Sequence, residues 1–322
     1  MGAFDGEKMN HYLGRLALGS NQWIPIDATH YGTIREHKAH LIRSLEIEER
    51  FDILLGNYRE FEEDILKMAL RNTVILAQQA NDWNTQRREM NRRIANFLSS
   101  ARLYLDHLRH DIMGIFGAKS TQAEQINADI SAHFDSSFSY RLMEALRNHV
   151  QHRGLAVPSF SVNHRLTELR PGAQVACTVT PQMMKRYLLA DSKLTAKIRS
   201  EIEALPDSTD LKPHVREYMG CLNQINNHVR TLLQTELPVW EATIRTAIDE
   251  FKNHFSLRDD ASTVALAIFQ CEGEAPVSVS ERHDIFMDFI EYRRHLATVN
   301  RVIEKLATHF ATGQQEDLIK TK

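Results

Sequence analysis

One segment near the middle of the chain, residues 142–154, carries side chains suited to a phosphate group. It places Arg147, Asn148, His149 and His152 near the end of an amphipathic helix. Arginine is permanently charged and its planar guanidinium matches a phosphate, whereas histidine can take up or release a proton near neutral pH. This combination suits the binding or cleavage of a phosphodiester.

The helix that carries these side chains is expected to begin near Ser139 and to end at Gly154. Leu142, Leu146 and Val150 recur every four residues, which is typical of the buried face of a helix. Glycine readily adopts the left-handed conformation that closes a helix, so we expect Gly154 to be the stop. The candidate residues would then lie in the last turns, held by a rigid element close to its open end.

Three further helices are predicted before this one. The first runs from Ile47 and the second from about Asn84 to Met113, and each has apolar residues in alternating steps of four and three. These two stripes consist of Ile47, Phe51, Leu54, Tyr58, Phe61, Ile65 and Met68, and of Ile94, Leu98, Ala101, Leu105, Leu108 and Ile112. Thr121 and Glu124 form a capping box for a shorter third helix. The scarcity of glycine and proline also favours a mainly α fold.

The spacing Arg147-x4-His152, with Asn148 directly after the arginine, resembles the signature of the HEPN superfamily. These proteins are helical bundles that include many metal-independent ribonucleases of toxin, defence and RNA-processing systems. The predicted helices, with the motif ending the fourth, are similar to that family's bundle. The resemblance covers residues 45–158 and implies a HEPN-like four-helix bundle.

The resemblance also implies that two motif helices face each other across a symmetric homodimer. In that arrangement Arg147 would neutralise the scissile phosphate, and His152 would act as general base or acid for attack by the neighbouring 2′-hydroxyl of RNA. Asn148 would orient His152 or the phosphate. The family further implies a bacterial toxin or defence role, an antitoxin or regulatory protein as partner, and no metal or cofactor.

Each of these residues also has a purely structural interpretation. Arg147 could pair with Glu144, His152 could cap the helix end, and Asn148 could face the solvent. The chain would then be a non-catalytic HEPN-like dimeric scaffold that binds a nucleotide or a protein partner, so the sequence leaves enzymatic activity open. His149 is expected to point away as a surface residue, although its spacing from His152 also permits a metal pair.

Composition and common motifs exclude several other classes of protein. The formal net charge of −3 gives no global reason to bind nucleic acid, so any RNA contact must be local. The three cysteines are far apart and fit neither a disulfide framework nor a thiolate zinc site, which favours the cytoplasm. No apolar run reaches the roughly 18 residues of a membrane span. The glycine-rich loops of ATPases and dehydrogenases are not visible.

A cluster of arginines, Arg87-Arg88 and Arg92-Arg93, could follow a nucleic-acid backbone. A solvated helix face is the simpler interpretation. Trp83 is the single aromatic residue nearby in the sequence, and one ring does not make a base-stacking platform.

The chain is expected to divide into four parts. Residues 1–44 form an irregular arm, 45–158 the bundle, 159–312 a mainly α-helical region with short strands, and 313–322 a disordered tail. Residues 159–162 and 174–179 are predicted as a hairpin with its turn at 170–172. Further helices are predicted at 181–189, 194–205, 211–255 and 281–310, with an interruption near Pro238 and a strand pair at 263–270 and 276–280.

Overall fold

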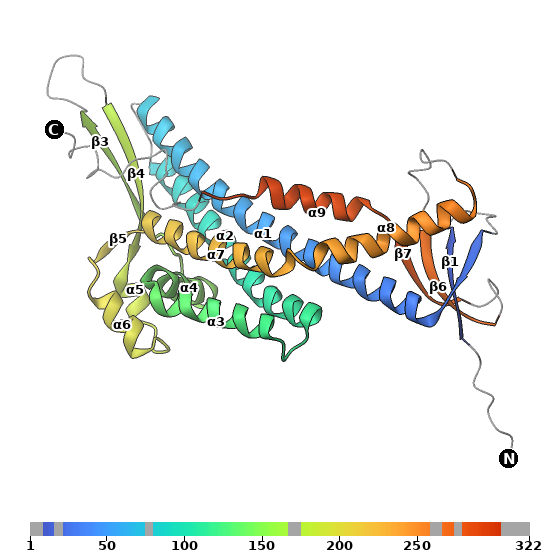
Figure 1. The fold of residues 1–322 in the computed structure, drawn as a ribbon. Helices are drawn as coiled ribbons and strands as arrows, with labels where there is room; N and C mark the ends of the chain where they lie inside the picture. The colour runs from blue at the N-terminus through green and yellow to red at the C-terminus, as the bar shows by residue number, and fades with distance from the viewer. Residues whose placement is uncertain are drawn as a thin grey trace, which may run out of the picture. The chain divides into compact units, whose positions relative to one another are not determined.

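The computed structural model describes residues 9–15, 22–74, 80–166, 175–257, 266–273 and 279–303. The fold is mainly α-helical with a few short strands, as predicted (Figure 1). Within these residues, no helix combines the length and the apolar character needed to cross a lipid bilayer.

The elements follow one another as two strands, four helices and then alternating strands and helices. The helices are α1 (Ala28–Val74), α2 (Ala80–Phe116), α3 (Thr121–Ser136), α4 (Phe138–His152), α5 (Lys185–Leu189), α6 (Ala196–Glu203), α7 (Lys212–Leu233), α8 (Leu237–His254) and α9 (Asp288–Val299). The strands are β1 (Met9–Arg15), β2 (Trp23–Ile26), β3 (Ser159–Leu166), β4 (Val175–Met184), β5 (Ser208–Asp210), β6 (Leu266–Glu272) and β7 (Val279–Ile285).

The chain divides into two compact units, each assembled from separated parts of the sequence. The first contains Met1–Glu49, Asp111–Ala118 and Arg230–Val299, and the second contains Arg50–His110, Lys119–Val229 and Asn300–Lys322. The division falls within α1, α2 and α7, which therefore contribute residues to both units. The second unit includes residues on both sides of position 158, where the sequence pattern suggested a boundary.

The first unit contains an antiparallel sheet with the strand order β2-β1-β6-β7 (Figure 1). Gly14 in β1 lies opposite Trp23 in β2, and a Cβ on Gly14 would come within 2.6 Å of the Trp23 ring. Only glycine leaves room for the ring at this place. The Trp23 ring in turn lies 4.5 Å from the ring of Phe269, which packs with Ala267 and Cys271 in a small core.

The expectation of an irregular arm over residues 1–44 was wrong where these residues are described. Met9–Arg15 and Trp23–Ile26 are strands, and α1 begins at Ala28. Asp27 caps this helix, since its Oδ1 accepts a hydrogen bond from the backbone N–H of His30 at 2.8 Å. The sequence pattern missed β1 because its partner β6 lies far away in the sequence and a periodicity search sees only neighbouring residues.

The second unit has a helical core that includes α7 from the C-terminal half. All members of the two predicted apolar stripes are buried, which confirms the two long amphipathic helices. The Tyr218 ring of α7 lies 6.0 Å from Phe97 of α2 and 4.9 Å from Tyr140 of α4. The Tyr104 hydroxyl of α2 donates to Oδ1 of Asn226 in α7 at 3.0 Å. The helices predicted to form a bundle by themselves therefore share their core with α7.

Two short strands of the second unit confirm the predicted hairpin. β3 pairs antiparallel with β4, and β5 adds to the other edge of β4 (Figure 1). The predicted turn at 170–172 and the predicted tail at 313–322 lie outside the described residues.

Several element boundaries differ from the prediction for local reasons. Ser120 rather than Thr121 caps α3, because its Oγ accepts from the backbone N–H of Ala123 at 3.2 Å. The helix predicted from residue 281 begins only at Asp288, because Val279–Ile285 pairs with β6 as β7. The helix predicted over 211–255 is interrupted between Leu233 and Leu237, next to Pro238 as expected.

Replacing Glu62 by alanine tests the buried contact between α1 and α7. Glu62 accepts two hydrogen bonds from Arg216 at 2.6 and 2.7 Å, and the Arg216 side chain is only 1% exposed. Glu62→Ala would leave this buried charge uncompensated, so we expect a loss of about 2 to 3 kcal/mol in the free energy of unfolding. Urea denaturation followed by circular dichroism measures this loss of unfolding free energy.

Glu63→Ala is the matched control for this change. Glu63 pairs with Arg59 and Lys67 on an exposed face, where ion pairs contribute at most about 1 kcal/mol. Equal losses for Glu62→Ala and Glu63→Ala would contradict a structural role for the buried pair.

Candidate functional site

Helix α4, which carries the predicted site, is anchored at its N-terminal end by side-chain contacts. Ser137 caps the helix, since its Oγ accepts from the backbone N–H of Tyr140 at 3.1 Å and donates to Glu217 of α7 at 2.6 Å. Arg141 donates two hydrogen bonds to Glu201 of α6 at 2.6 and 3.0 Å. These contacts set the rotation of α4 and thereby decide which of its side chains reach the surface.

Asn148 and His152 lie together at a surface pocket of about 250 Å³. The two residues are four positions apart and Ala145 precedes Asn148 by three, so all three share one side of the helix. Arg147 does not line this pocket, because five residues at about 100° each place it roughly 140° from His152 around the axis. The structure thus brings together two of the three predicted site residues and leaves the third on a neighbouring side of α4.

The opposite wall of this pocket comes from the segment after α5. Arg153 donates to Oδ1 of Asp191 at 2.8 Å, and the backbone N–H of Lys193 donates to the same oxygen at 2.9 Å. The backbone bond, followed by the nearby Arg153 charge, holds the pKa of Asp191 below its usual range. Arg153 offsets the Asp191 charge, so the exposed Lys193 leaves the pocket with a net positive charge when His152 is neutral. Such a pocket favours an anion.

Arg147 carries a guanidinium that forms no ion pair with any described residue. Its Nη1 donates to Oδ1 of Asn148 at 3.0 Å, while its buried Nε has no hydrogen-bond partner. The alternative pairing with Glu144 is not formed, because Glu144 accepts from the Tyr218 hydroxyl at 2.7 Å and lies 3.8 Å from Arg102. The positive charge of Arg147 is therefore available to an incoming anion.

The two histidines of α4 differ in exposure, and His149 is buried where the sequence predicted a surface residue. His149 is only 6% exposed, whereas His152 lies on the surface. The expectation that His149 points away as a surface residue was wrong, because it lies three residues after Leu146 on the buried side of α4. Burial lowers the pKa of His149, and the nearby Arg153 adds to this effect.

Gly154 ends α4 in a different way from the one predicted. Its backbone is not in the left-handed region, which among described glycines is adopted by Gly117 and Gly273. The backbone N–H groups of Arg153 and Gly154 both donate to the His149 carbonyl, at 2.8 and 3.1 Å. A Cβ on Gly154 would lie 3.3 Å from Nε2 of His149, so the glycine makes room for the buried ring.

Three charged residues that line the pocket were missed by the sequence pattern. Arg153 directly follows His152, and its position next to the motif was a signal that could have found it. Asp191 and Lys193 come from a loop almost forty residues later in the chain, and no local pattern links that loop to α4.

Histidine pairs with metal-ligand spacing do not belong to larger clusters in the part of the chain that the structure describes. Among the described residues, no group of three or more histidine, cysteine, aspartate or glutamate side chains is placed to hold a metal ion. His37 contacts the Thr243 hydroxyl at 2.8 Å, and the ring of His40 lies 4.9 Å from that of Trp240. Both histidines are thus engaged in contacts with α8.

Two arginines of the α2 cluster make contacts within the protein, and the other two are exposed to solvent. Arg93 pairs with Asp64 at 2.7 Å and Arg87 donates to the Pro158 carbonyl at 3.3 Å, whereas Arg88 and Arg92 are exposed. Trp83 also has an aromatic neighbour that the sequence did not indicate, because Phe160 of β3 stacks on it at 5.0 Å. The surface therefore contains two stacked rings and two exposed arginines.

Comparison of the chain with protein-family models, curated proteins and solved structures found no match. The resemblance to the HEPN superfamily therefore rests on Arg147, Asn148 and His152 and on the predicted helices alone.

The stability of the protein should fall between pH 7 and pH 5 in part through His149. Because burial lowers its pKa in the folded state, the unfolded chain binds the proton more readily. The contribution of neutral His149 is complete above the unfolded pKa of about 6.5 and is lost as the pH falls toward the folded value. His149→Gln should show a smaller loss in unfolding free energy than the wild type.

Urea denaturation of both proteins at pH 7.5 and pH 5.5 measures this difference. His152→Gln is the matched control, because the His152 side chain is exposed on the same helix. The assignment is wrong if His149→Gln and the wild type lose the same stability between the two pH values.

Proposed function

We propose that the protein is a metal-independent endoribonuclease whose site lies on the last turns of α4. The observation that carries this proposal is the local chemistry of Arg147, Asn148 and His152. They present a guanidinium without a counter-ion among the described residues, an amide and an exposed imidazole at the edge of a positively charged pocket. This is the set of groups that a phosphodiester cleavage by an internal nucleophile needs.

Each residue has a distinct role in this proposal. Arg147 neutralises the scissile phosphate and the charge that develops on it in the transition state. His152 takes the proton from the neighbouring 2′-hydroxyl or gives one to the leaving 5′-oxygen. Asn148, which already accepts a hydrogen bond from Arg147, orients the guanidinium or the phosphate. The products are a 2′,3′-cyclic phosphate and a 5′-hydroxyl end.

A homodimer completes the site in this proposal. Arg147 and His152 lie on different sides of α4, so a single copy does not direct both groups at one phosphate. A second α4 related by twofold symmetry can supply the missing group, as in an isologous interface. The proposed setting is the cytoplasm, as a toxin or defence protein held in check by an antitoxin or regulatory partner.

Trp83 offers a contact for single-stranded RNA outside the pocket. Its side chain is 37% exposed and stacks on Phe160, and the exposed Arg88 follows five residues later in α2. Aromatic rings that stack on bases, combined with cations along the backbone, are typical of single-strand binding surfaces.

A second function is favoured by one specific observation, namely that Arg147 does not line the pocket with His152. In this alternative the chain is a non-catalytic dimeric scaffold, and the pocket binds a nucleotide or a side chain of a protein partner. Lys193 would then provide the charge that holds an anion, and no proton would be transferred.

RNA cleavage in the presence of EDTA distinguishes the two functions. We expect the wild type to cut a labelled RNA pool and to leave cyclic-phosphate ends. Arg147→Ala and His152→Ala should each reduce the rate by about two orders of magnitude or more, because each removes a group that acts in the transition state. Gel electrophoresis with end-group analysis measures the products.

His107→Ala is the matched control, since His107 is an exposed histidine of α2 that does not line the pocket at Asn148 and His152. Light scattering and circular dichroism confirm that each variant keeps the assembly and fold of the wild type. Cleavage that persists in both α4 variants would contradict the proposed site, and a wild type that binds a nucleotide without cutting RNA would support the scaffold.

Trp83→Ala should weaken the binding of a single-stranded RNA by about fivefold or more. Base stacking on an aromatic side chain contributes about 1 to 3 kcal/mol per base. Fluorescence anisotropy with a labelled oligonucleotide measures the dissociation constant. Tyr292→Ala is the control because Tyr292 is a comparably exposed aromatic residue of the first unit, at 46%. Equal effects of the two substitutions would exclude a specific stacking contact.

A further inference from the structure

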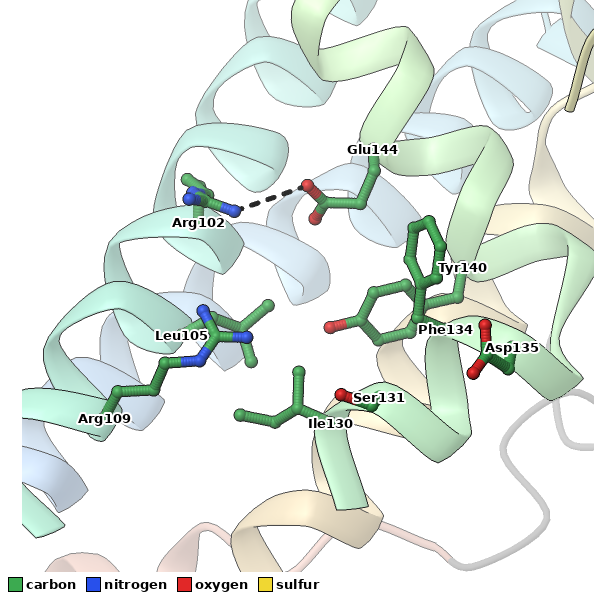
Figure 2. A pocket seen from close by; sticks show the side chains of 9 residues that line it. All are labelled: Arg102, Leu105, Arg109, Ile130, Ser131, Phe134, Asp135, Tyr140 and Glu144. Carbon is green, nitrogen blue, oxygen red and sulfur yellow. Dashed lines mark ion pairs between the residues drawn. The ribbon is translucent and has the colours of Figure 1, made fainter. Parts of the chain in front are cut away.

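A second pocket of about 280 Å³ lies between α2, α3 and α4, all in the second unit (Figure 2). Figure 2 shows Arg102 and Arg109 projecting from α2 toward the side chains of α3 and α4. Tyr140 and Glu144 contribute the α4 wall. This pocket shares no residue with the one at Asn148 and His152.

Two hydrogen-bond donors in this pocket have no partner among the described residues. Arg109 forms no ion pair or hydrogen bond there, although the residue is half-buried and its guanidinium faces the pocket (Figure 2). The Tyr140 hydroxyl points into the same space and also lacks a hydrogen bond, although the residue is only 2% exposed. Half-buried polar groups without partners are sites where a ligand gains most from a hydrogen bond.

The two acidic side chains of this pocket do not neutralise Arg109. Glu144 already accepts from the buried Tyr218 hydroxyl at 2.7 Å and pairs with Arg102 at 3.8 Å. Asp135 lies on the side of the pocket away from Arg109 in Figure 2. Arg109 therefore keeps a charge that no carboxylate of the described residues pairs with.

The Tyr140 hydroxyl is held in its donor form. Burial, followed by the charge of Glu144, raises its pKa, so it stays protonated throughout the physiological range. A neutral hydroxyl beside a guanidinium can donate to the same carboxylate or phosphate oxygens.

The remaining surface of the pocket is apolar and partly aromatic. Leu105 and Ile130 are 2% and 4% exposed, whereas Phe134 is 42% exposed and meets the Tyr140 ring edge-on at 6.0 Å. The exposed Phe134 face and the two aliphatic side chains favour a flat apolar body. The volume is near the lower end of the 300 to 1,000 Å³ of ordinary ligand pockets, which restricts the ligand to a small molecule.

We infer that this pocket binds a small planar ligand with an anionic group, a carboxylate or a phosphate. Arg109 and the Tyr140 hydroxyl hold the anionic group, and the flat body lies against Phe134, Leu105 and Ile130. The site is independent of the proposed ribonuclease site and does not require it.

Binding of benzoate and phenyl phosphate to the full chain tests this inference. The two probes share a ring and differ in the anionic group, so their relative affinities separate a carboxylate site from a phosphate site. Benzyl alcohol has the ring without the charge, and acetate and inorganic phosphate have the charge without the ring. Isothermal titration calorimetry gives the dissociation constants, and ligand-observed NMR extends the range to millimolar affinities.

We expect Arg109→Gln to weaken binding of the better probe by at least about tenfold, because a hydrogen bond to a charged group is lost. Tyr140→Phe should weaken it by about threefold to tenfold while keeping the ring that packs against Phe134 and Tyr218. Arg92→Gln is the matched control, since Arg92 is exposed on the same helix and lies outside the pocket. Circular dichroism verifies that all variants are folded.

Three results would overturn the inference. The first is that neither ring-bearing anion binds at millimolar concentration. The second is that benzyl alcohol, acetate or inorganic phosphate binds as tightly as the better probe, since the ligand would then not need both the ring and the charge. The third is that Arg92→Gln weakens binding as much as Arg109→Gln, which indicates general attraction to a basic surface.

Discussion

The packing of α7 against α1, α2 and α4 is the constraint on which the second unit depends. The buried side of α7 carries polar groups as well as apolar ones, and three of these polar groups bind partners on other helices. Arg216 binds Glu62, Tyr218 donates to Glu144, and Asn226 accepts from Tyr104. A buried polar group without its partner is costly, so these contacts select one register and one rotation for every helix around α7.

That constraint determines what α4 presents to the solvent. Because Tyr218 and Arg102 engage Glu144, this carboxylate is not left to neutralise Arg147 three residues later. The same rotation buries His149 and exposes His152. Contacts made elsewhere on the helix thus leave the Arg147 charge without Glu144 as a partner and leave the His152 imidazole exposed. A substitution in α7 that changed these contacts would therefore alter the candidate site.

The two pockets of the second unit use different sides of α4 and different chemistry. Asn148 and His152 face a pocket whose charge comes from a loop after α5, and its groups suit proton transfer near a phosphate. Tyr140 and Glu144 face a pocket with aromatic and aliphatic walls and a half-buried arginine, which suits retention of a small molecule. A single helix can serve both because positions about 100° apart around its axis point into separate spaces.

The sequence by itself determined the helical class, the buried stripes of α1 and α2, the extent of α4 and the presence of Arg147, Asn148 and His152 near its end. These follow from spacing and end signals, which are properties of neighbouring residues. Only the tertiary structure decided that β1 pairs with β6, that α7 enters the helical core, that His149 is buried and that Asp191 and Lys193 complete a pocket with His152. Each of these depends on contacts between residues far apart in the chain, and local periodicity carries no information about such partners.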